Sequence, residues 1–222
     1  MKSVRFAAIA IGCALLLASG SPSVRADFVN GSFEDGDYSF DGNGAASLPV
    51  GSTTITGWTT FGGELAVIRN ANAFGLSTPF GDHFIDLAGY HDSAPYGGVE
   101  QSIATVVGGT YVVSLYLNLY NGIGAIGPDS VTVTAGGSSE ILSVVTDDPN
   151  NVWLERTFTF VAQSTSTLVQ IQGNSSASGN YIGLDNVSIT GTGAVPEPSS
   201  VVMLGLGGLG MLGYARARKG AR

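Results

Sequence analysis

The sequence predicts an all-β domain built as a sandwich of short strands. The middle of the chain is dominated by Gly, Ser, Thr and Val, and no stretch repeats apolar residues at helical spacing over three turns. Short apolar or alternating runs are instead separated by turn clusters such as Gly108-Gly109 and Gly136-Gly137. Nine or more strands with this punctuation are typical of a sandwich, and a closed barrel is the alternative.

The clearest strand runs from Tyr111 to Tyr120, where large apolar residues alternate with more polar ones. Alternation with a period of two places Leu115 and Leu117 on one face and Tyr116, Asn118 and Tyr120 on the other. The same reasoning predicts further strands at Thr53–Phe61, Glu64–Arg69, His83–Leu87, Val99–Thr105, Ser130–Ala135, Glu140–Val145, Trp153–Ala162, Thr167–Gln172 and Tyr181–Thr190.

The N-terminal end predicts export. Residues 1–26 contain Lys2 and Arg5, an apolar run and small residues ending at Ala26, which is the pattern of a secretory signal peptide cleaved before Asp27. A lipoprotein signal using Cys13 is the alternative, but the residues before this cysteine match it poorly. Without the signal peptide the chain has no cysteine, so neither disulfides nor thiol chemistry are expected.

The C-terminal end combines a short motif, a marginal apolar run and a basic end. The motif Val195-Pro196-Glu197-Pro198 lies in a linker over 191–200, and 201–222 hold an apolar segment followed by Arg and Lys. As a helix the apolar segment would span about 22 Å, which is short of a hydrocarbon core of about 30 Å. The basic residues would stay on the cytoplasmic side, so the segment is expected to hold the membrane only briefly.

These features resemble a PEP-CTERM sorting signal. In that family an exosortase in the inner membrane of Gram-negative bacteria recognises and processes the tail. The resemblance implies an exported protein located at the cell surface or in the extracellular polysaccharide matrix. A simple C-terminal membrane anchor is the alternative.

The domain between these ends, residues 27–190, is strongly acidic. From 27 to 194 the two basic residues are Arg69 and Arg156, against sixteen Asp and Glu, which gives a formal net charge of −14. This charge argues against nucleic acid or anionic lipid as a partner. This charge is compatible with a soluble exported protein, or with one that binds divalent cations.

The two ends of the domain are expected to meet at a carboxylate. If Val187 and Ile189 face the core, the period of two places Asp185 on the same face. A buried carboxylate requires a cation or several hydrogen bonds, and basic residues are scarce here. Calcium bound by carboxylate and backbone oxygens would satisfy it, and hydrogen bonds alone are the alternative.

The domain contains an ordered set of short segments, namely Asn30-Gly31-Ser32-Phe33-Glu34, Gly57-Trp58, Asp86-Leu87-Ala88-Gly89, Val99-Glu100-Gln101-Ser102-Ile103, Gly109-Thr110-Tyr111, Trp153, Phe158-Thr159-Phe160 and Leu184-Asp185-Asn186-Val187-Ser188. This set resembles the galactose-binding-like jelly rolls, which include carbohydrate-binding modules and exported choice-of-anchor proteins. The resemblance implies a jelly-roll β-sandwich. It also implies a structural calcium between Glu34 and Asp185, with backbone oxygens around Asn30 and Ser32.

Signals for catalysis are weak. Gly122-Ile123-Gly124-Ala125-Ile126-Gly127 matches a dinucleotide fingerprint, but a strand follows it where a helix is needed. His83 and Asp86 fall on opposite faces of one strand, so they cannot chelate one ion without a bulge. No Gly-x-Ser-x-Gly elbow is present. A non-enzymatic protein is therefore expected.

Four tyrosines are the predicted ligand-binding residues, because exposed aromatic rings stack on sugars. Tyr116 and Tyr120 lie on the polar face of their strand, and Tyr90 and Tyr96 lie in a Gly- and Asp-rich loop. The preferred function is a non-catalytic carbohydrate-binding domain attached to matrix polysaccharide. A structural matrix protein acting through protein contacts and a polysaccharide hydrolase remain alternatives.

Overall fold

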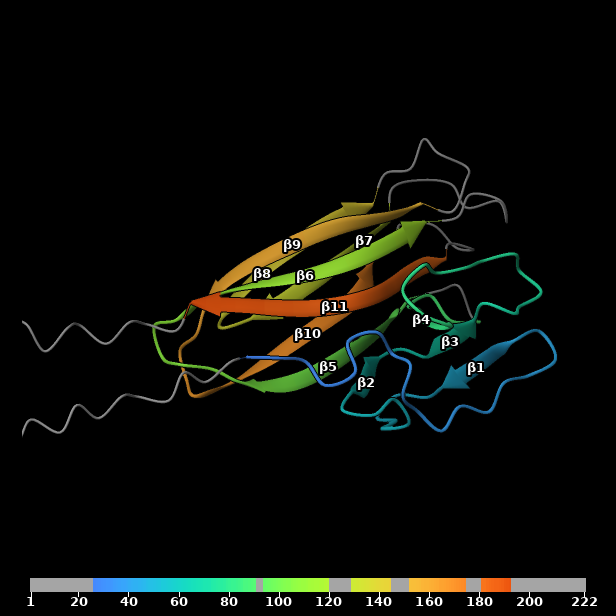
Figure 1. Ribbon diagram of the computed structural model, residues 1–222, viewed down its shortest axis with the longest axis horizontal. Helices are drawn as coiled ribbons and strands as arrows, with labels where there is room; N and C mark the ends of the chain where they lie inside the picture. Colours follow the sequence, from blue (N-terminus) through green and yellow to red (C-terminus); the bar gives the residue numbers. More distant parts are fainter. Residues whose placement is uncertain (1–25, 91–93, 120–128, 145–151, 175–180, 193–222) are drawn as a thin grey trace, which may run out of the picture.

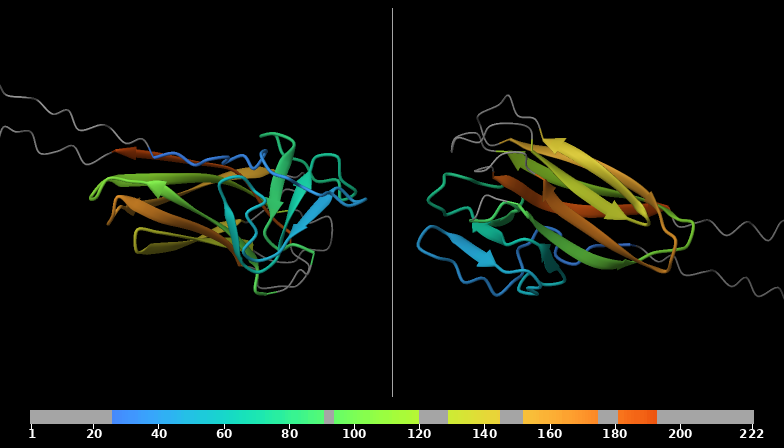
Figure 2. Two further views of the ribbon diagram at one scale, coloured as in Figure 1. Left: turned by 90° about the horizontal axis from the view of Figure 1, so that it is seen from below. Right: turned by 180° about the vertical axis from the view of Figure 1, so that it is seen from behind.

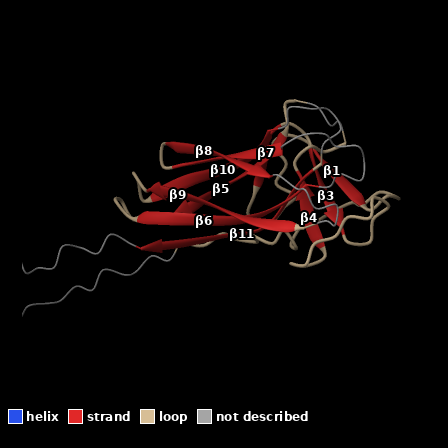
Figure 3. Ribbon diagram, turned by 90° about the horizontal axis from the view of Figure 1, so that it is seen from above, coloured by secondary structure: helices blue, strands red, loops and turns tan. Residues whose placement is uncertain are grey.

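The computed structural model describes residues 26–90, 94–119, 129–144, 152–174 and 181–192. These residues form eleven β-strands and no helix, which confirms the predicted all-β class (Figures 1 and 3). In this part of the chain, no helix is long and apolar enough to cross a membrane. The predicted C-terminal apolar helix over 201–222 lies outside the described residues.

The strands form two antiparallel sheets, which gives a sandwich and not a closed barrel (Figure 2). The six-stranded sheet has the order β1 (Ala45–Leu48), β3 (Leu65–Arg69), β4 (His83–Asp86), β11 (Ile182–Thr192), β6 (Thr110–Leu119) and β9 (Trp153–Val161). The five-stranded sheet has the order β2 (Thr59–Gly62), β5 (Gly97–Ala104), β10 (Ser166–Asn174), β7 (Asp129–Ala135) and β8 (Ser138–Val144).

Most predicted strands are confirmed to within a few residues, but one predicted strand is shorter than expected and one observed strand was not predicted. The predicted strand over 53–61 shortens to β2, because Trp58 N–H donates to the Ile55 carbonyl in a turn (3.0 Å). Strand β1 was not predicted, since its sequence Ala-Ala-Ser-Leu has no apolar alternation. It is paired along its whole length with β3, so tertiary pairing and not local pattern defines it.

The main core lies between the two sheets and takes the alternating apolar residues of both. Strand β6 buries Tyr111, Val113, Leu115 and Leu117 there, as its period of two predicts. The fully buried Trp58 completes the packing at the end of the core nearest residues 29–36, which we call the opening loop. Its ring stacks on Phe28 and packs obliquely on Phe33, with centroid distances of 5.1 and 5.4 Å.

A second, smaller apolar cluster lies on the other face of the six-stranded sheet. Its buried members are Ala45, Ala66, Ile68, Leu76, Phe84 and Tyr181. The segment 70–82, between β3 and β4, covers it, and two side-chain hydrogen bonds join this segment to β9 and β11. The Trp153 indole N–H donates to the Ser77 carbonyl (2.8 Å), and the Thr78 hydroxyl donates to Asp185. This sheet is therefore buried on both faces in this region.

A bulge in β11 reverses one predicted orientation. The pairing with β6 shifts register between Asp185 and Ser188, and Asn186 has a φ of 47°. Leu184 and Val187 consequently both belong to the main core. The prediction that Asp185 shares a face with Val187 is wrong, because the extra residue places Asp185 on the face covered by segment 70–82.

The opening loop and the last strand lie side by side, as expected (Figure 1). The Val187 N–H donates to the Gly31 carbonyl at 2.7 Å. Only glycine fits at position 31, because a Cβ there would lie 1.9 Å from the Val187 carbonyl oxygen. This contact brings Glu34 into the neighbourhood of Asp185.

Candidate functional site

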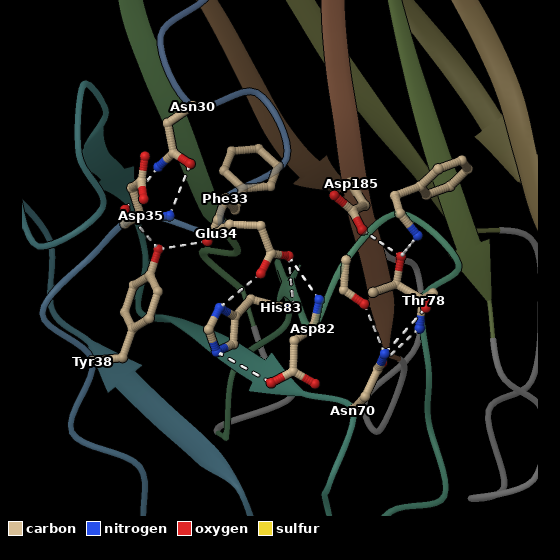
Figure 4. Close-up of polar contacts among 12 residues, drawn as sticks. Asn30, Phe33, Glu34, Asp35, Tyr38, Asn70, Thr78, Asp82, His83 and Asp185 are labelled. Atoms are coloured by element: carbon tan, nitrogen blue, oxygen red, sulfur yellow. Dashed lines mark hydrogen bonds and ion pairs between the residues drawn. The ribbon is translucent and has the colours of Figure 1, made fainter.

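Glu34 is held by the backbone at the start of β4. Its Oε1 accepts hydrogen bonds from the Asp82 and His83 N–H groups, both at 2.9 Å (Figure 4). Its Oε2 lies 3.3 Å from His83 Nδ1. That buried nitrogen makes no aligned hydrogen bond with any described residue, so the contact is a close approach and not a strong bond. The Glu34 carboxylate is thus fixed mainly by two amide groups.

Asp185 is completely buried and is also hydrogen-bonded. Its Oδ2 accepts from the Thr78 hydroxyl, and its Oδ1 accepts from the Asn186 N–H at 2.6 Å. Burial raises the pKa of Asp185 to about 7, although both hydrogen bonds act in the opposite direction. The negative charge of Glu34 raises this pKa further. The two carboxylates therefore interact, and neither Lys nor Arg is among their described contacts.

The other two predicted calcium ligands lie in the opening loop. The Asn30 side chain holds that loop together, donating to the Asp35 and Thr56 carbonyls and accepting from the Asp35 N–H. The Asn30 carbonyl already accepts from the Trp58 indole N–H (3.0 Å) and from the Phe33 N–H (3.1 Å). Ser32 lies in the same loop and is half-exposed.

The chemistry of this group fits calcium in part. Glu34 and Asp185 supply carboxylate oxygens, which calcium prefers, and loop carbonyls lie nearby. Among the described residues, however, no group of three or more His, Cys, Asp or Glu side chains is arranged to hold a metal. Backbone or water oxygens would have to complete the shell.

The four predicted tyrosines occupy different places. The Tyr90 side chain is 42% exposed, whereas Tyr96 is 6% exposed and so lacks the open ring face that stacking requires. Tyr116 is half-buried and packs against Phe80, with ring centroids 4.4 Å apart. Tyr120 lies outside the described residues. Among the three described tyrosines, only Tyr90 has an open ring, and the joint role of the four in binding stays a prediction.

Sequence reasoning did not identify the outer face of the five-stranded sheet, on the side away from the main core (Figure 2, right). We call this surface the amide face. Strand register aligns Phe61, Gly98, Gln172, Thr132 and Ile141 in one row across all five strands. A neighbouring row holds Thr59, Glu100, Gln170, Thr134 and Ser139. Glu100 is the one ionisable side chain among the described residues of these rows.

Contacts within the amide face fix its side chains. The Gln170 amide donates to Glu100 Oε2 at 2.7 Å, and the Gln172 amide donates to the Tyr96 carbonyl at 3.1 Å. The Phe61 ring lies against Gly98, where a Cβ would come within 2.6 Å of the ring. The sequence signal was the polar alternation Gln170, Gln172, Asn174, but strand pairing was needed to align it with Phe61.

The targeting residues fall at the edges of this structure. Ala26, the predicted last residue of the signal peptide, is described and is buried in the main core. Cleavage after it stays a prediction. The motif residues Val195, Pro196, Glu197 and Pro198 lie outside the described residues.

Residues 26–190 match the family described as Protein of unknown function (DUF642). The chain belongs to this family. Residues 194–219 match the PEP-CTERM protein-sorting motif, which confirms the predicted sorting signal. The DUF642 domain is thus followed by the motif of exported proteins that exosortase processes, and this chain is an exported protein.

No curated protein matches the chain. Several solved structures are similar to it, including the following three. TmCBM61 in complex with beta-1,4-galactotriose has a TM-score of 0.47 and 14% identity, covering 72% of this chain and 94% of that one. The CBM22-1 xylan-binding domain from Paenibacillus barcinonensis Xyn10C has a TM-score of 0.41 and 20% identity, with coverages of 68% and 94%. A family 35 carbohydrate binding module from Clostridium thermocellum has a TM-score of 0.41 and 13% identity, with coverages of 65% and 97%.

Proposed function

We propose that this DUF642 domain is a non-catalytic polysaccharide-binding domain of the cell surface or extracellular matrix, and that the amide face binds the polysaccharide. The observation that supports this most is the alignment of Phe61, Gln172 and Thr132 in a row across the sheet. A sugar chain presents hydroxyl groups at its edges and C–H groups on its ring faces. The amide face offers partners for both, namely amides and hydroxyls in rows and one aromatic ring.

The fixed geometry of these side chains supports binding of an extended chain. Gln170 and Gln172 are already hydrogen-bonded, so little side-chain entropy remains to be lost on binding. The rows run across strands about 4.8 Å apart, which spaces polar groups regularly along the surface. With Glu100 as its one described charge, the face suits a neutral polysaccharide better than an anionic one.

The sorting signal supports the same location. We propose that exosortase processes the tail after a transient hold in the inner membrane, and that the acidic domain then remains outside the cell. Sixteen carboxylates against two basic residues would keep the domain from adhering to nucleic acid and to anionic lipid. Attachment to matrix polysaccharide would then depend on local contacts such as those of the amide face.

Removing either the ring or one amide should weaken polysaccharide binding. We expect Phe61→Ala and Gln172→Ala each to lower the affinity of the full chain for its polysaccharide about tenfold, which corresponds to roughly 1.4 kcal/mol. Affinity electrophoresis and calorimetry against neutral polysaccharides, including the host's own matrix, would measure this.

The matched control is Gln163→Ala, because Gln163 is an exposed amide in the turn between β9 and β10, outside the amide face. Its affinity should equal that of the unmodified protein. Absence of binding to every polysaccharide by the folded protein would contradict the proposal and favour a structural matrix protein acting through protein contacts.

We further propose that Glu34 and Asp185 hold a structural calcium ion, with backbone oxygens of the opening loop completing the site. Support comes from the two interacting carboxylates and from the burial of Asp185 without a described cation. Bound calcium would supply positive charge between the opening loop, the start of β4 and β11. Its role would be structural, since Asp185 is buried and Glu34 is hydrogen-bonded to backbone amides.

Calcium should raise the melting temperature of the chelator-treated protein. At a hundredfold excess over its dissociation constant, a ligand that binds only the folded state stabilises it by about 3 kcal/mol. Differential scanning calorimetry in EDTA and then in excess calcium would measure the change, with magnesium as the control cation. Glu34→Gln should abolish the response, and an equal response in that variant would exclude this site.

A further inference from the structure

A pocket lies on the face of the six-stranded sheet that carries the smaller apolar cluster, and it is separate from the amide face. Its empty volume is about 490 Å³, which includes space open to solvent. The pocket is lined by Ala66 and Ile68 of β3, by Asp86 of β4 and by Tyr181, which precedes β11. The wall formed by segment 70–82 carries Phe74 and Leu76, and Tyr90 follows β4.

The exposed ring of this pocket is held in place. The Tyr90 hydroxyl donates to Asp41 Oδ2 at 2.5 Å, and the Tyr90 ring packs edge-on against Phe74, with centroids 6.4 Å apart. Asp41 is itself fixed, because its Oδ1 accepts from the Asn43 and Ala45 N–H groups. The loops that carry Asp41 and Phe74 are distant in sequence, and both hold the Tyr90 ring, which is 42% exposed. A ring fixed in this way offers a flat apolar surface at low entropic cost.

Polar groups lie beside this apolar wall. Asp86 Oδ1 accepts from the Ala88 N–H at 2.9 Å and from the Ile182 N–H at 3.3 Å, so the carboxylate is oriented by the backbone. Tyr181 is 1% exposed, and its hydroxyl has no hydrogen-bond partner among the described residues. This hydroxyl lies over Gly183, where a Cβ would come within 2.3 Å of it, so Tyr181 contributes a buried wall and not an accessible polar group.

We propose that this pocket binds a single neutral hexopyranose unit, with its apolar face on Tyr90 and its hydroxyl groups directed to Asp86. The combination of a fixed aromatic ring, apolar walls and a carboxylate matches a molecule that has one C–H face and a hydroxylated edge. Asp41 and Asp86 are both acidic, so a sugar acid is disfavoured by like-charge repulsion. A chain end or a side branch fits such a pocket, whereas the interior of an extended chain fits the amide face.

The test is a titration of the purified full chain with methyl glycosides of glucose, galactose, mannose and glucuronic acid, by saturation-transfer NMR and calorimetry. We expect at least one neutral glycoside to bind and the glucuronide to bind several-fold more weakly. Tyr90→Ala should lower the affinity about tenfold or more, and Asp86→Asn several-fold. Tyr90→Phe keeps the ring and loses the bond to Asp41, so it should lie between Tyr90→Ala and the unmodified protein.

The matched control is Asp37→Asn, an exposed carboxylate outside the pocket, which should leave glycoside affinity unchanged. Binding of no neutral glycoside by the folded protein, or equal affinity in Tyr90→Ala, would overturn the proposal. This assay uses monosaccharides and pocket variants, and the polysaccharide assay uses amide-face variants. Failure of one site is therefore distinguishable from failure of the other.

Discussion

Trp58→Ala should destabilise the domain by roughly 3–5 kcal/mol, the range for removing a large aromatic side chain from a core. Trp58 is 1% exposed and packs against both Phe28 and Phe33. Its indole N–H also donates to the Asn30 carbonyl, which ties the opening loop to the core. The substitution removes the packing and the bond together, so the melting temperature should fall by about 10 °C for a domain of this size.

Trp153→Ala is the matched comparison, because Trp153 is half-buried at the edge of the smaller cluster. Its loss should cost less than half as much. Trp58→Phe keeps an aromatic ring and removes the indole donor, so its cost should be about 1 kcal/mol. Chemical denaturation of the variants measures these differences. Equal destabilisation by Trp58→Ala and Trp153→Ala would show that burial does not determine their contributions.

The sequence predicts the sandwich well because its strands obey a simple period. Alternation in β6 and the apolar residues of β10 are local signals, and the structure confirms both. Strand β1 has no such signal and exists through its pairing with β3. A strand can therefore be predicted where its own residues alternate between apolar and polar. It cannot be predicted where only its pairing with another strand defines it.

The candidate sites were less predictable, because each depends on how distant segments meet. A single inserted residue in β11 moves Asp185 to the other face. Asn186 tolerates the left-handed conformation found at the bulge, but an Asn alone does not predict a bulge at this position. Tyr90 and Tyr96 come from one short stretch, yet one ring is exposed and the other buried. The amide face needs the register of five strands, which residue spacing within any one of them does not contain.

The contribution of Asp185 to the free energy of unfolding of the calcium-free protein should fall as pH rises from about 4 to 7. Burial raises the pKa of Asp185 from its ordinary 3.8 to about 7 in the folded state. A group with a raised folded pKa contributes stability that is fully present below its unfolded pKa and is lost as pH passes the folded value. Three pKa units correspond to roughly 4 kcal/mol, because each unit is about 1.4 kcal/mol.

Asp185→Asn isolates this contribution, since its amide is neutral at every pH in the range. Relative to the unmodified protein, the variant should gain stability between pH 4 and 7 by up to that amount. Asp37→Asn, which changes an exposed carboxylate, should instead run parallel to the unmodified protein. Urea titrations in EDTA at several pH values give the three curves. A constant difference between Asp185→Asn and the unmodified protein would mean that Asp185 stays ionised throughout. The bonds from Thr78 and Asn186 would then suffice to hold a buried charge without any cation.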